Sequence, residues 1–287
     1  MARPRSAPGL PTTPGGWLAC YRYRLLDGDG QPSSPEDIGG QLGVSGDTVR
    51  RWEANRALPS DSDLRRFSEV CRLSPIERAF LVRAFSAVPS ETASESGAFG
   101  WFVEQVLAIE FPAYIYDSLF FIRAWNSYIE VAHRPLDPGG EHLVERILAE
   151  PDPRYATNQN LWSTRPERAE WWLRDFWYET AELCGSPAYV KLMEKLARSE
   201  QFAEKWPDLG LLEGAERPAP IGRPRFRVDP VRGSFLTTVS AIVLPPTYYV
   251  RMFLPSDATA WNRLEERRQA SRPTITMLSC VHWDEPD

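Results

Sequence analysis

The segment SPEDIGGQLGVSGDTVRRWE (34–53) constrains the fold of this 287-residue chain more than any other stretch. Ser34 is a preferred N-cap residue, Pro35 suits the first helical position, and an acid follows at the third position of a capping box. Gly43 ends this helix, and Ser45 caps the next one. We therefore expect two short helices that are joined by a tight turn.

The apolar residues of this segment are spaced so that the two helices pack against each other across the turn. This packing leaves the outer face of the second helix free, and a single α-helix fits the major groove of DNA. The residues that form the apolar contact are Ile38, Leu42, Val44, Val49 and Trp52. The candidate DNA-binding residues are Ser45, Gly46, Asp47, Thr48, Arg50 and Arg51, with Asn55 and Arg56 just beyond the helix.

The net charge of the chain, −6, does not argue against a nucleic-acid partner, because the local field governs such binding. The first 90 residues contain 12 arginines and 10 acidic residues, so the excess of acid lies in the remainder. A generic helical bundle with a solvated arginine pair is the alternative interpretation of Arg50 and Arg51.

Further helical patterns surround this segment, and the stretch 15–86 resembles the helix-turn-helix domain of XRE (phage-repressor-like) transcriptional regulators. The matching blocks are the capped helix start, Gly43-Val44-Ser45, Val49 with Trp52-Glu53, Leu58-Pro59 and a final capped helix that begins at Ser74. The resemblance implies an all-α bundle that binds double-stranded DNA. Pro35 stands where the family often has a glutamine that contacts DNA, and Gly39 replaces the usual alanine. A pair of glycines inside a helix is costly, which suggests a close helix–helix contact at Gly39-Gly40.

Composition divides the chain into five parts. The N-terminal stretch (1–14) lacks the apolar core of a signal peptide and is expected to be disordered, and VPSETASESG has the composition of a linker. No run of about 18 apolar residues occurs, so we expect no membrane partner and a cytoplasmic location at the nucleoid. The expected parts are a leader (1–14), a helix-turn-helix domain (15–87), a linker (88–98), a second domain (99–269) and a C-terminal tail (270–287) with strand-like alternation.

The second domain is expected to be α+β, because strand-like runs at both of its ends flank helical patterns. It resembles the PAS-like, ligand-binding C-terminal domain of MmyB-like regulators in PAYIYDSLFFIRAWN (112–126), SEQFAEKW (199–206) and the segment 225–257. This resemblance implies a sensor of small apolar molecules such as fatty acids. The expected fold is thus an N-terminal all-α helix-turn-helix bundle followed by an α+β PAS-like domain.

A sheet that curves against helices tends to enclose an apolar cavity, and this domain is rich in tryptophan and tyrosine. The candidate ligand-binding residues are Tyr116, Trp125, Phe176, Trp206 and Tyr249, although core packing is the alternative for each of them. Asn126 is expected to cap a helix. Arg123 and Arg251 are expected on an exposed strand face, with pairing to a ligand carboxylate as the alternative.

The sequence contains no motif of a catalytic, metal or cofactor site, so we expect no enzyme activity, no metal and no cofactor. The cysteines at 20, 71, 184 and 280 are far apart and are expected to be reduced thiols. The sequence therefore predicts a DNA-binding transcriptional regulator that responds allosterically to a small apolar ligand, as a homodimer formed near 97–109. The alternative is a regulator whose C-terminal domain docks a protein partner.

Overall fold

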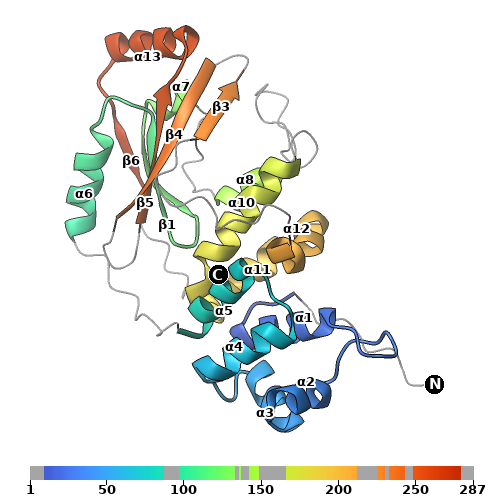
Figure 1. Cartoon of the computed structure of the whole chain (residues 1–287). Helices are drawn as coiled ribbons and strands as arrows, with labels where there is room; N and C mark the ends of the chain where they lie inside the picture. Colours follow the sequence, from blue (N-terminus) through green and yellow to red (C-terminus); the bar gives the residue numbers. More distant parts are fainter. Residues whose placement is uncertain are drawn as a thin grey trace. The chain divides into compact units, whose positions relative to one another are not determined.

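A computed structural model of the chain describes residues 10–86, 97–132, 136, 142–148, 166–211, 225–229, 233–242 and 248–278. The chain divides into two compact units. The first, here called the helical unit, comprises Met1–Pro89 and Leu173–Pro218. The second, called the sheet unit, comprises Ser90–Trp172 and Ala219–Asp287. The predicted fold class is confirmed, because an N-terminal helical region precedes a region of helices and antiparallel strands (Figure 1).

The N-terminal part of the helical unit is a series of five helices whose starts follow the capping signals of the sequence. Ser34 accepts a hydrogen bond from the Asp37 backbone N–H, and the Asp37 carboxylate accepts one from the Ser34 N–H, which completes a capping box. The last helix begins with the same arrangement between Ser74 and Glu77. The five helices are α1 (Pro14–Arg24), α2 (Pro35–Leu42), α3 (Gly46–Glu53), α4 (Asp61–Val70) and α5 (Pro75–Ser86).

The helical unit also contains a second run of helices that is far away in the sequence. Helix α10 (Pro166–Glu179) enters this unit at Leu173. It is followed by η1 (Ala181–Leu183), α11 (Pro187–Leu196), α12 (Glu200–Lys205) and η2 (Trp206–Leu211). The predicted boundaries differ from this division, since they assigned 173–211 to the second domain.

An aromatic cluster explains why these two sequence segments form one unit. The Trp177 ring stacks on Phe80 of α5 with 4.3 Å between the ring centroids, and it lies 5.9 Å from Trp17 of α1. Trp206 lies 6.1 Å from Trp17. All four side chains are buried, and aromatic rings are among the side chains that contribute most to core stability. We call Trp17, Phe80, Trp177 and Trp206 the tryptophan cluster.

The sheet unit is built on six strands in the order β3-β4-β5-β1-β2-β6, and every neighbouring pair is antiparallel. The predicted hairpin is confirmed as β4 and β5, and the predicted tail contributes β6, which pairs with β2. The strands are β1 (Ala113–Asp117), β2 (Ile122–Asn126), β3 (Arg225–Asp229), β4 (Gly233–Ile242), β5 (Tyr248–Pro255) and β6 (Ile275–Met277).

Helix α6 (Gly97–Leu107) lies along one face of this sheet (Figure 1). Val103 and Leu107 of α6 pack against a strip of small and aliphatic residues that includes Ala113, Ile115 and Val250. Because successive strand residues point to opposite faces, the residues between them form the other face. Register places Tyr114 beside Arg251 and Tyr116 beside Tyr249 on that opposite face.

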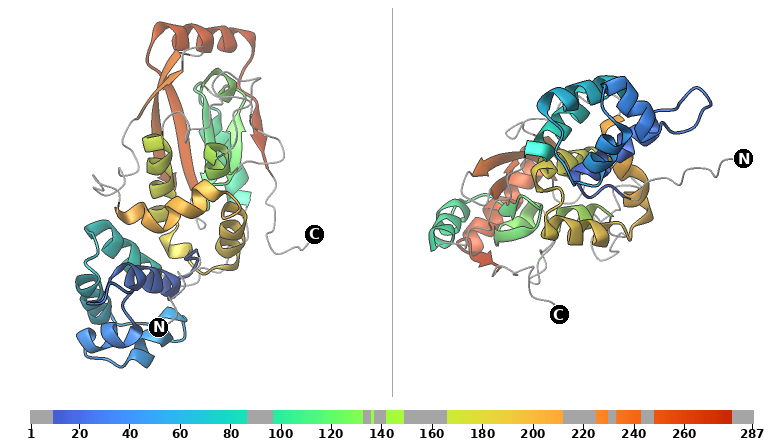
Figure 2. Two further views of the ribbon diagram at one scale, coloured as in Figure 1. Left: turned by 90° about the vertical axis from the view of Figure 1, so that its right-hand side faces the viewer. Right: turned by 90° about the horizontal axis from the view of Figure 1, so that it is seen from below.

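The other helices that lie wholly within the described part of the sheet unit are short, apart from α13. They are α7 (Ile129–Ala132), α8 (Leu143–Leu148) and α13 (Ala258–Ala270), and α13 lies across one end of the sheet (Figures 1 and 2). Asp257 caps α13 and also accepts a hydrogen bond from the Ser234 N–H on β4, at 2.6 Å. This carboxylate therefore links the start of α13 to the start of β4.

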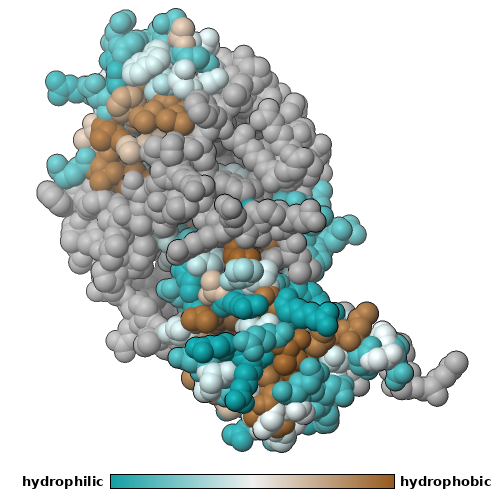
Figure 3. Space-filling model, viewed as in Figure 1, coloured by the Kyte–Doolittle hydropathy of each residue, from teal (hydrophilic) through white to brown (hydrophobic). Residues whose placement is uncertain are grey.

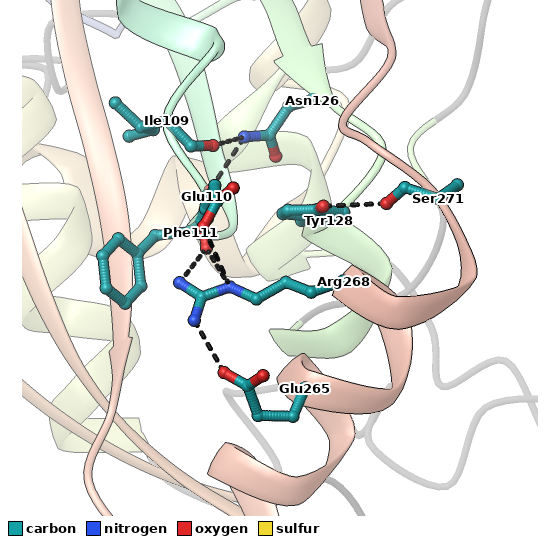
Figure 4. A network of polar contacts seen from close by, with 8 residues as sticks. All are labelled: Ile109, Glu110, Phe111, Asn126, Tyr128, Glu265, Arg268 and Ser271. Atoms are coloured by element: carbon teal, nitrogen blue, oxygen red, sulfur yellow. Dashed lines mark hydrogen bonds and ion pairs between the residues drawn. The ribbon is translucent and has the colours of Figure 1, made fainter.

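The Asn126 amide has a different role from the predicted one. It is fully buried, and its Nδ2 donates to the carbonyl oxygens of Leu107, Ile109 and Phe111, at 2.8–3.2 Å (Figure 4). Its Oδ1 accepts from the Ala113 N–H. The prediction of a helix cap was wrong, because this amide satisfies the backbone of the connection between α6 and β1.

Two further contacts tie α13 to its surroundings (Figure 4). The Arg268 guanidinium donates to the Glu110 carbonyl oxygen, at 2.7 Å, and pairs with the Glu265 carboxylate. The Tyr128 hydroxyl donates to the Ser271 carbonyl oxygen, at 2.8 Å. Within the described residues, no helix is long and apolar enough to cross a membrane.

Candidate functional site

The turn between α2 and α3 brings the two helices so close that glycine is required. A Cβ on Gly39 would lie 2.8 Å from the Val44 carbonyl oxygen and 2.9 Å from the Gly46 nitrogen. The predicted close contact is thus found at Gly39, whereas a Cβ on Gly40 would meet nothing within 4 Å. Gly43 ends α2 with a φ of 75°, a conformation that favours glycine.

Helix α3 turns its apolar side inward and its arginines outward. Val49 and Trp52 are buried, whereas Arg50 and Arg51 are exposed, as predicted. Ser45 caps the helix by accepting a hydrogen bond from the Thr48 N–H, at 3.1 Å. The N-terminal turn of α3 and its arginines therefore form an accessible polar surface, which we call the α3 surface.

One arginine of the α3 surface is paired with the preceding helix. The Arg50 guanidinium forms an ion pair with the Glu36 carboxylate of α2, and both side chains are more than half exposed. The hydrogen bond from Arg50 lowers the pKa of Glu36. Arg51 and Arg56 are also exposed, and no ion pair within the described part of the chain includes either of them.

The end of α3 is held by α1. Arg22 forms a two-pronged ion pair with Glu53, at 2.5 and 3.0 Å, and also donates to the Ser33 carbonyl oxygen. A Cβ on Gly15 would lie only 2.4 Å from the Trp52 carbonyl oxygen, so the start of α1 fits against the last turn of α3. These contacts fix the orientation of α3 within the bundle.

Asn55 is used within the bundle rather than being directed away from it. Its φ of 54° lies in the left-handed region, where Asn is one of the favoured residues. The amide Oδ1 accepts from the Gly15 N–H at 2.8 Å, and Nδ2 donates to the Thr13 hydroxyl at 2.9 Å. Its side chain therefore secures the start of α1, a role that differs from the predicted DNA contact.

Sequence reasoning missed Arg66, which lies on α4 and donates to the Leu42 carbonyl oxygen at the end of α2, at 3.4 Å. This contact places a cation beside the turn that precedes α3. The adjacent pair Arg65-Arg66 in an exposed helical position was the available signal. On the visible face of α1–α5, hydrophilic residues are interspersed with hydrophobic ones (Figure 3).

The second candidate site is the aromatic face of the sheet, here defined as Tyr114, Tyr116, Trp125, Tyr249, Arg251 and Phe253. Tyr116 and Tyr249 stack with 5.1 Å between their centroids, and Tyr114 lies 5.8 Å from Phe253. Trp125 is buried and pairs in register with Tyr114. Three of the five predicted ligand-binding residues, Tyr116, Trp125 and Tyr249, therefore share one face of one sheet.

The other two predicted ligand-binding residues lie in the helical unit. The ring of Phe176 is 5.5 Å from that of Trp206, which also stacks on Phe202. The Trp206 Nε1 donates to the Pro11 carbonyl oxygen, at 3.4 Å. Both residues thus belong to a different compact unit from the aromatic face.

The expectation that Arg123 and Arg251 lie on an exposed strand face was wrong. Arg123 pairs with Asp117, at 2.6 Å, and two backbone N–H groups also donate to that carboxylate. Burial raises the pKa of Asp117, although these partners favour its ionised form. Arg251 is only 5% exposed, because the sheet is covered on both sides at β5.

The described cysteines are free thiols. Burial raises the pKa of Cys20 to about 11 and the pKa values of Cys71 and Cys184 to about 12. Thiols of this kind are poor nucleophiles at neutral pH, because the reactive thiolate is scarce. Cys280 lies outside the described residues.

Comparison with known proteins agrees with the arrangement of the first helices. Residues 33–81 match the family model of a helix-turn-helix domain. A search of curated protein sequences gave no significant match. The matched residues include all of α2, α3 and α4 and the first half of α5, so the α3 surface lies on the second helix of the motif. The chain therefore contains an N-terminal helix-turn-helix domain, which indicates a DNA-binding regulator.

Proposed function

We propose that this protein is a sequence-specific transcriptional regulator that inserts α3 into the major groove of its operator. The observation that carries the proposal is the orientation of α3. Val49 and Trp52 fix one side of the helix in the bundle, while Arg50 and Arg51 remain exposed on the other side. An arginine in this position can donate two hydrogen bonds to guanine, and the second helix of such motifs lies in the major groove.

The N-terminal turn of α3 supplies the remaining proposed contacts. Ser45, Gly46, Asp47 and Thr48 lie at the helix start, where backbone N–H groups and short polar side chains can contact phosphates or base edges. Arg51 and Arg56 are available for DNA without breaking an ion pair. Arg50 must first leave Glu36, so Glu36 competes with DNA for this guanidinium.

The second part of the proposal is that the C-terminal region senses a small apolar ligand, fatty-acid-like by resemblance, and tunes operator binding allosterically. It has no catalytic role in this proposal and acts in the cytoplasm, at the nucleoid. A ligand that binds one arrangement of the region more tightly shifts the population toward that arrangement. The aromatic face supports this part, because it gathers Tyr116, Trp125 and Tyr249.

We further propose that the regulator is a homodimer, because two-fold operators place their half-sites about 34 Å apart. The region 97–109 was the predicted dimer interface. Val103 and Leu107 of this region are buried against the sheet, so a dimer would use other residues of α6. Analytical ultracentrifugation tests the oligomeric state, and a monomer at the concentrations used for DNA binding contradicts this part.

The test of DNA binding is the double variant Arg50→Ala/Arg51→Ala. The probe is a DNA fragment that the full-length protein selects from a random library. We expect the affinity to fall about 100-fold or more, because each two-pronged contact with guanine contributes about 1–3 kcal/mol. The variant should keep the circular dichroism spectrum of the parent protein, since both side chains are exposed.

The matched control is Arg198→Ala, which removes an exposed arginine from the helical unit outside the helix-turn-helix domain. This variant should bind the selected DNA like the parent protein. Normal DNA binding by the double variant would instead favour the alternative function, in which the C-terminal region docks a protein partner. In that case the regulator proposal fails for α3.

A further inference from the structure

The sheet unit contains a buried arginine, Arg251, whose Nε donor lacks an acceptor. Arg251 of β5 is 5% exposed, and its Nε has no hydrogen-bond partner. None of the ion pairs among the described residues includes Arg251. Arg123 differs, since it pairs with Asp117, and Arg268 differs, since it donates to the Glu110 carbonyl oxygen and to Glu265.

Aromatic rings surround the Arg251 guanidinium. Its carbon lies 3.9 Å from the centroid of the Trp172 ring and 5.7 and 5.9 Å from those of Tyr116 and Tyr114. All of these residues belong to the sheet unit. Such rings attract a cation through their π faces, yet they accept no hydrogen bonds of the usual strength from its N–H groups. The rings therefore partly compensate the positive charge of Arg251, whereas its Nε–H group remains without an acceptor.

A buried cation without a carboxylate partner is costly, so the arrangement favours an anion that arrives from outside the protein. The planar fork of a guanidinium matches the two oxygens of a carboxylate. One cation balances one negative charge, and this favours a carboxylate over a phosphate monoester, which carries up to two. The stacked pair Tyr116–Tyr249 and the Trp172 ring favour a flat aromatic body through offset or edge-to-face contacts.

We propose that the aromatic face of the sheet unit binds a small aromatic monocarboxylate, with the Arg251 guanidinium donating to both carboxylate oxygens. This inference rests on the proposed sensing function and specifies its ligand class. It differs from the resemblance-based expectation of an apolar, fatty-acid-like ligand in requiring a charged head group and a planar body.

The test uses isothermal titration calorimetry of the full chain with three probes. Naphthoate carries both proposed features, naphthalenemethanol lacks the charge, and octanoate lacks the ring. Naphthoate should bind about 10- to 100-fold more tightly than naphthalenemethanol, as expected for charge-assisted hydrogen bonds to a buried partner. Equal affinity for these two probes overturns the role of Arg251, as does the absence of saturable naphthoate binding. Tighter binding of octanoate than of naphthoate overturns the proposal that the ligand has an aromatic body.

The variant Arg251→Met isolates the contribution of the guanidinium. It removes an unpaired buried charge and keeps an unbranched apolar side chain, so it should fold and lose the preference for naphthoate over naphthalenemethanol. Arg251→Lys keeps a charge but not the fork, and it should show a smaller preference than the parent protein. A preserved preference in Arg251→Met contradicts the proposal.

The matched control is Arg268→Met, which removes another ring-contacting arginine of the sheet unit whose donors are satisfied. It should retain the naphthoate preference of the parent protein. Failure of the naphthoate test leaves the Arg50 and Arg51 experiment unaffected, because that experiment concerns the helical unit and DNA. The two proposals can therefore fail separately.

Discussion

In the helix-turn-helix domain, Arg22 and Arg24 pair with Glu53 and Glu77 and Arg51 is exposed to water, whereas Arg251 of the sheet unit lies buried among aromatic rings. An exposed arginine needs no protein partner, because water solvates its charge. In the part of the chain that the structure describes, Arg251 has neither water nor a carboxylate to compensate its charge, and only aromatic rings contact its guanidinium face. The α3 surface is therefore recognised by its exposed arginines, whereas the aromatic face is recognised by a buried arginine that lacks an ion pair among the described residues.

The interiors of the two units also differ. The tryptophan cluster joins residues of α1 and α5 to residues about 100 or more positions later in the chain. The sheet unit depends on strand register and on the buried Asn126 amide, whose contacts lie within 20 residues of it. Because the two interiors share no residues, we expect that each can be weakened by itself.

The largest expected effect comes from Trp177→Ala. Removal of this fully buried ring should lower the free energy of unfolding of the helical unit by about 3–5 kcal/mol, because a cavity opens beside Phe80 and Trp17. Amide hydrogen exchange, followed peptide by peptide, measures the change. Protection should fall in α1 and α5 although the mutation lies in neither. Unchanged protection in α1 and α5 would show that these helices are stable without the Trp177 ring.

A smaller loss is expected for Asn126→Ala, which affects the sheet unit. The substitution leaves the Ala113 N–H and three carbonyl oxygens without their side-chain partner, which should cost about 2–4 kcal/mol. Hydrogen exchange should rise in β1 and at the end of α6. Asn126→Asp separates the two kinds of contact, because it keeps the acceptor for the Ala113 N–H and loses the donors to the carbonyl oxygens.

The smallest individual changes in stability are expected for Gly39→Ala and Gly40→Ala on α2, and they should have opposite signs. A Cβ at Gly39 meets backbone atoms of the turn, so this variant should lose about 1–3 kcal/mol of stability. A Cβ at Gly40 meets nothing, and alanine there should stabilise the helix by about 0.5–1 kcal/mol. Urea denaturation compares the two variants. The same change in midpoint for both would show that the turn tolerates a side chain.

Local signals of the sequence were sufficient for the helix-turn-helix. Caps at Ser34 and Ser45, the glycine at 43 and the spacing of Val49 and Trp52 fix two helices and the direction of the arginines. These signals act over a few residues, so they can be read without knowledge of the rest of the chain. The role of Asn55 could not be read in this way, because its partners Thr13 and Gly15 lie about 40 residues earlier.

The α+β class of the sheet unit could be predicted from the sequence, whereas the burial of its charged residues could not. Alternation in β5 predicts two faces, yet it does not tell whether the second face meets water or other residues. Arg251 was therefore expected to be exposed, and the cover of both faces became evident only in the structure. The sequence also did not show that Phe176 and Trp206 lie in the helical unit. Ring packing between segments that are far apart in the chain leaves no local sequence pattern.

The tryptophan cluster has a consequence for protein engineering and for the exchange of modules in evolution. Trp177 and Trp206 complete the interior beneath Trp17 and Phe80. A chimera that joins residues 1–87 to a foreign C-terminal domain would keep Trp17 and Phe80 but lose Trp177 and Trp206. The first two rings would then be exposed to water. We therefore expect that a transfer of α1–α5 to another protein also requires residues 173–211, so a junction directly after residue 87 should give a less stable chimera.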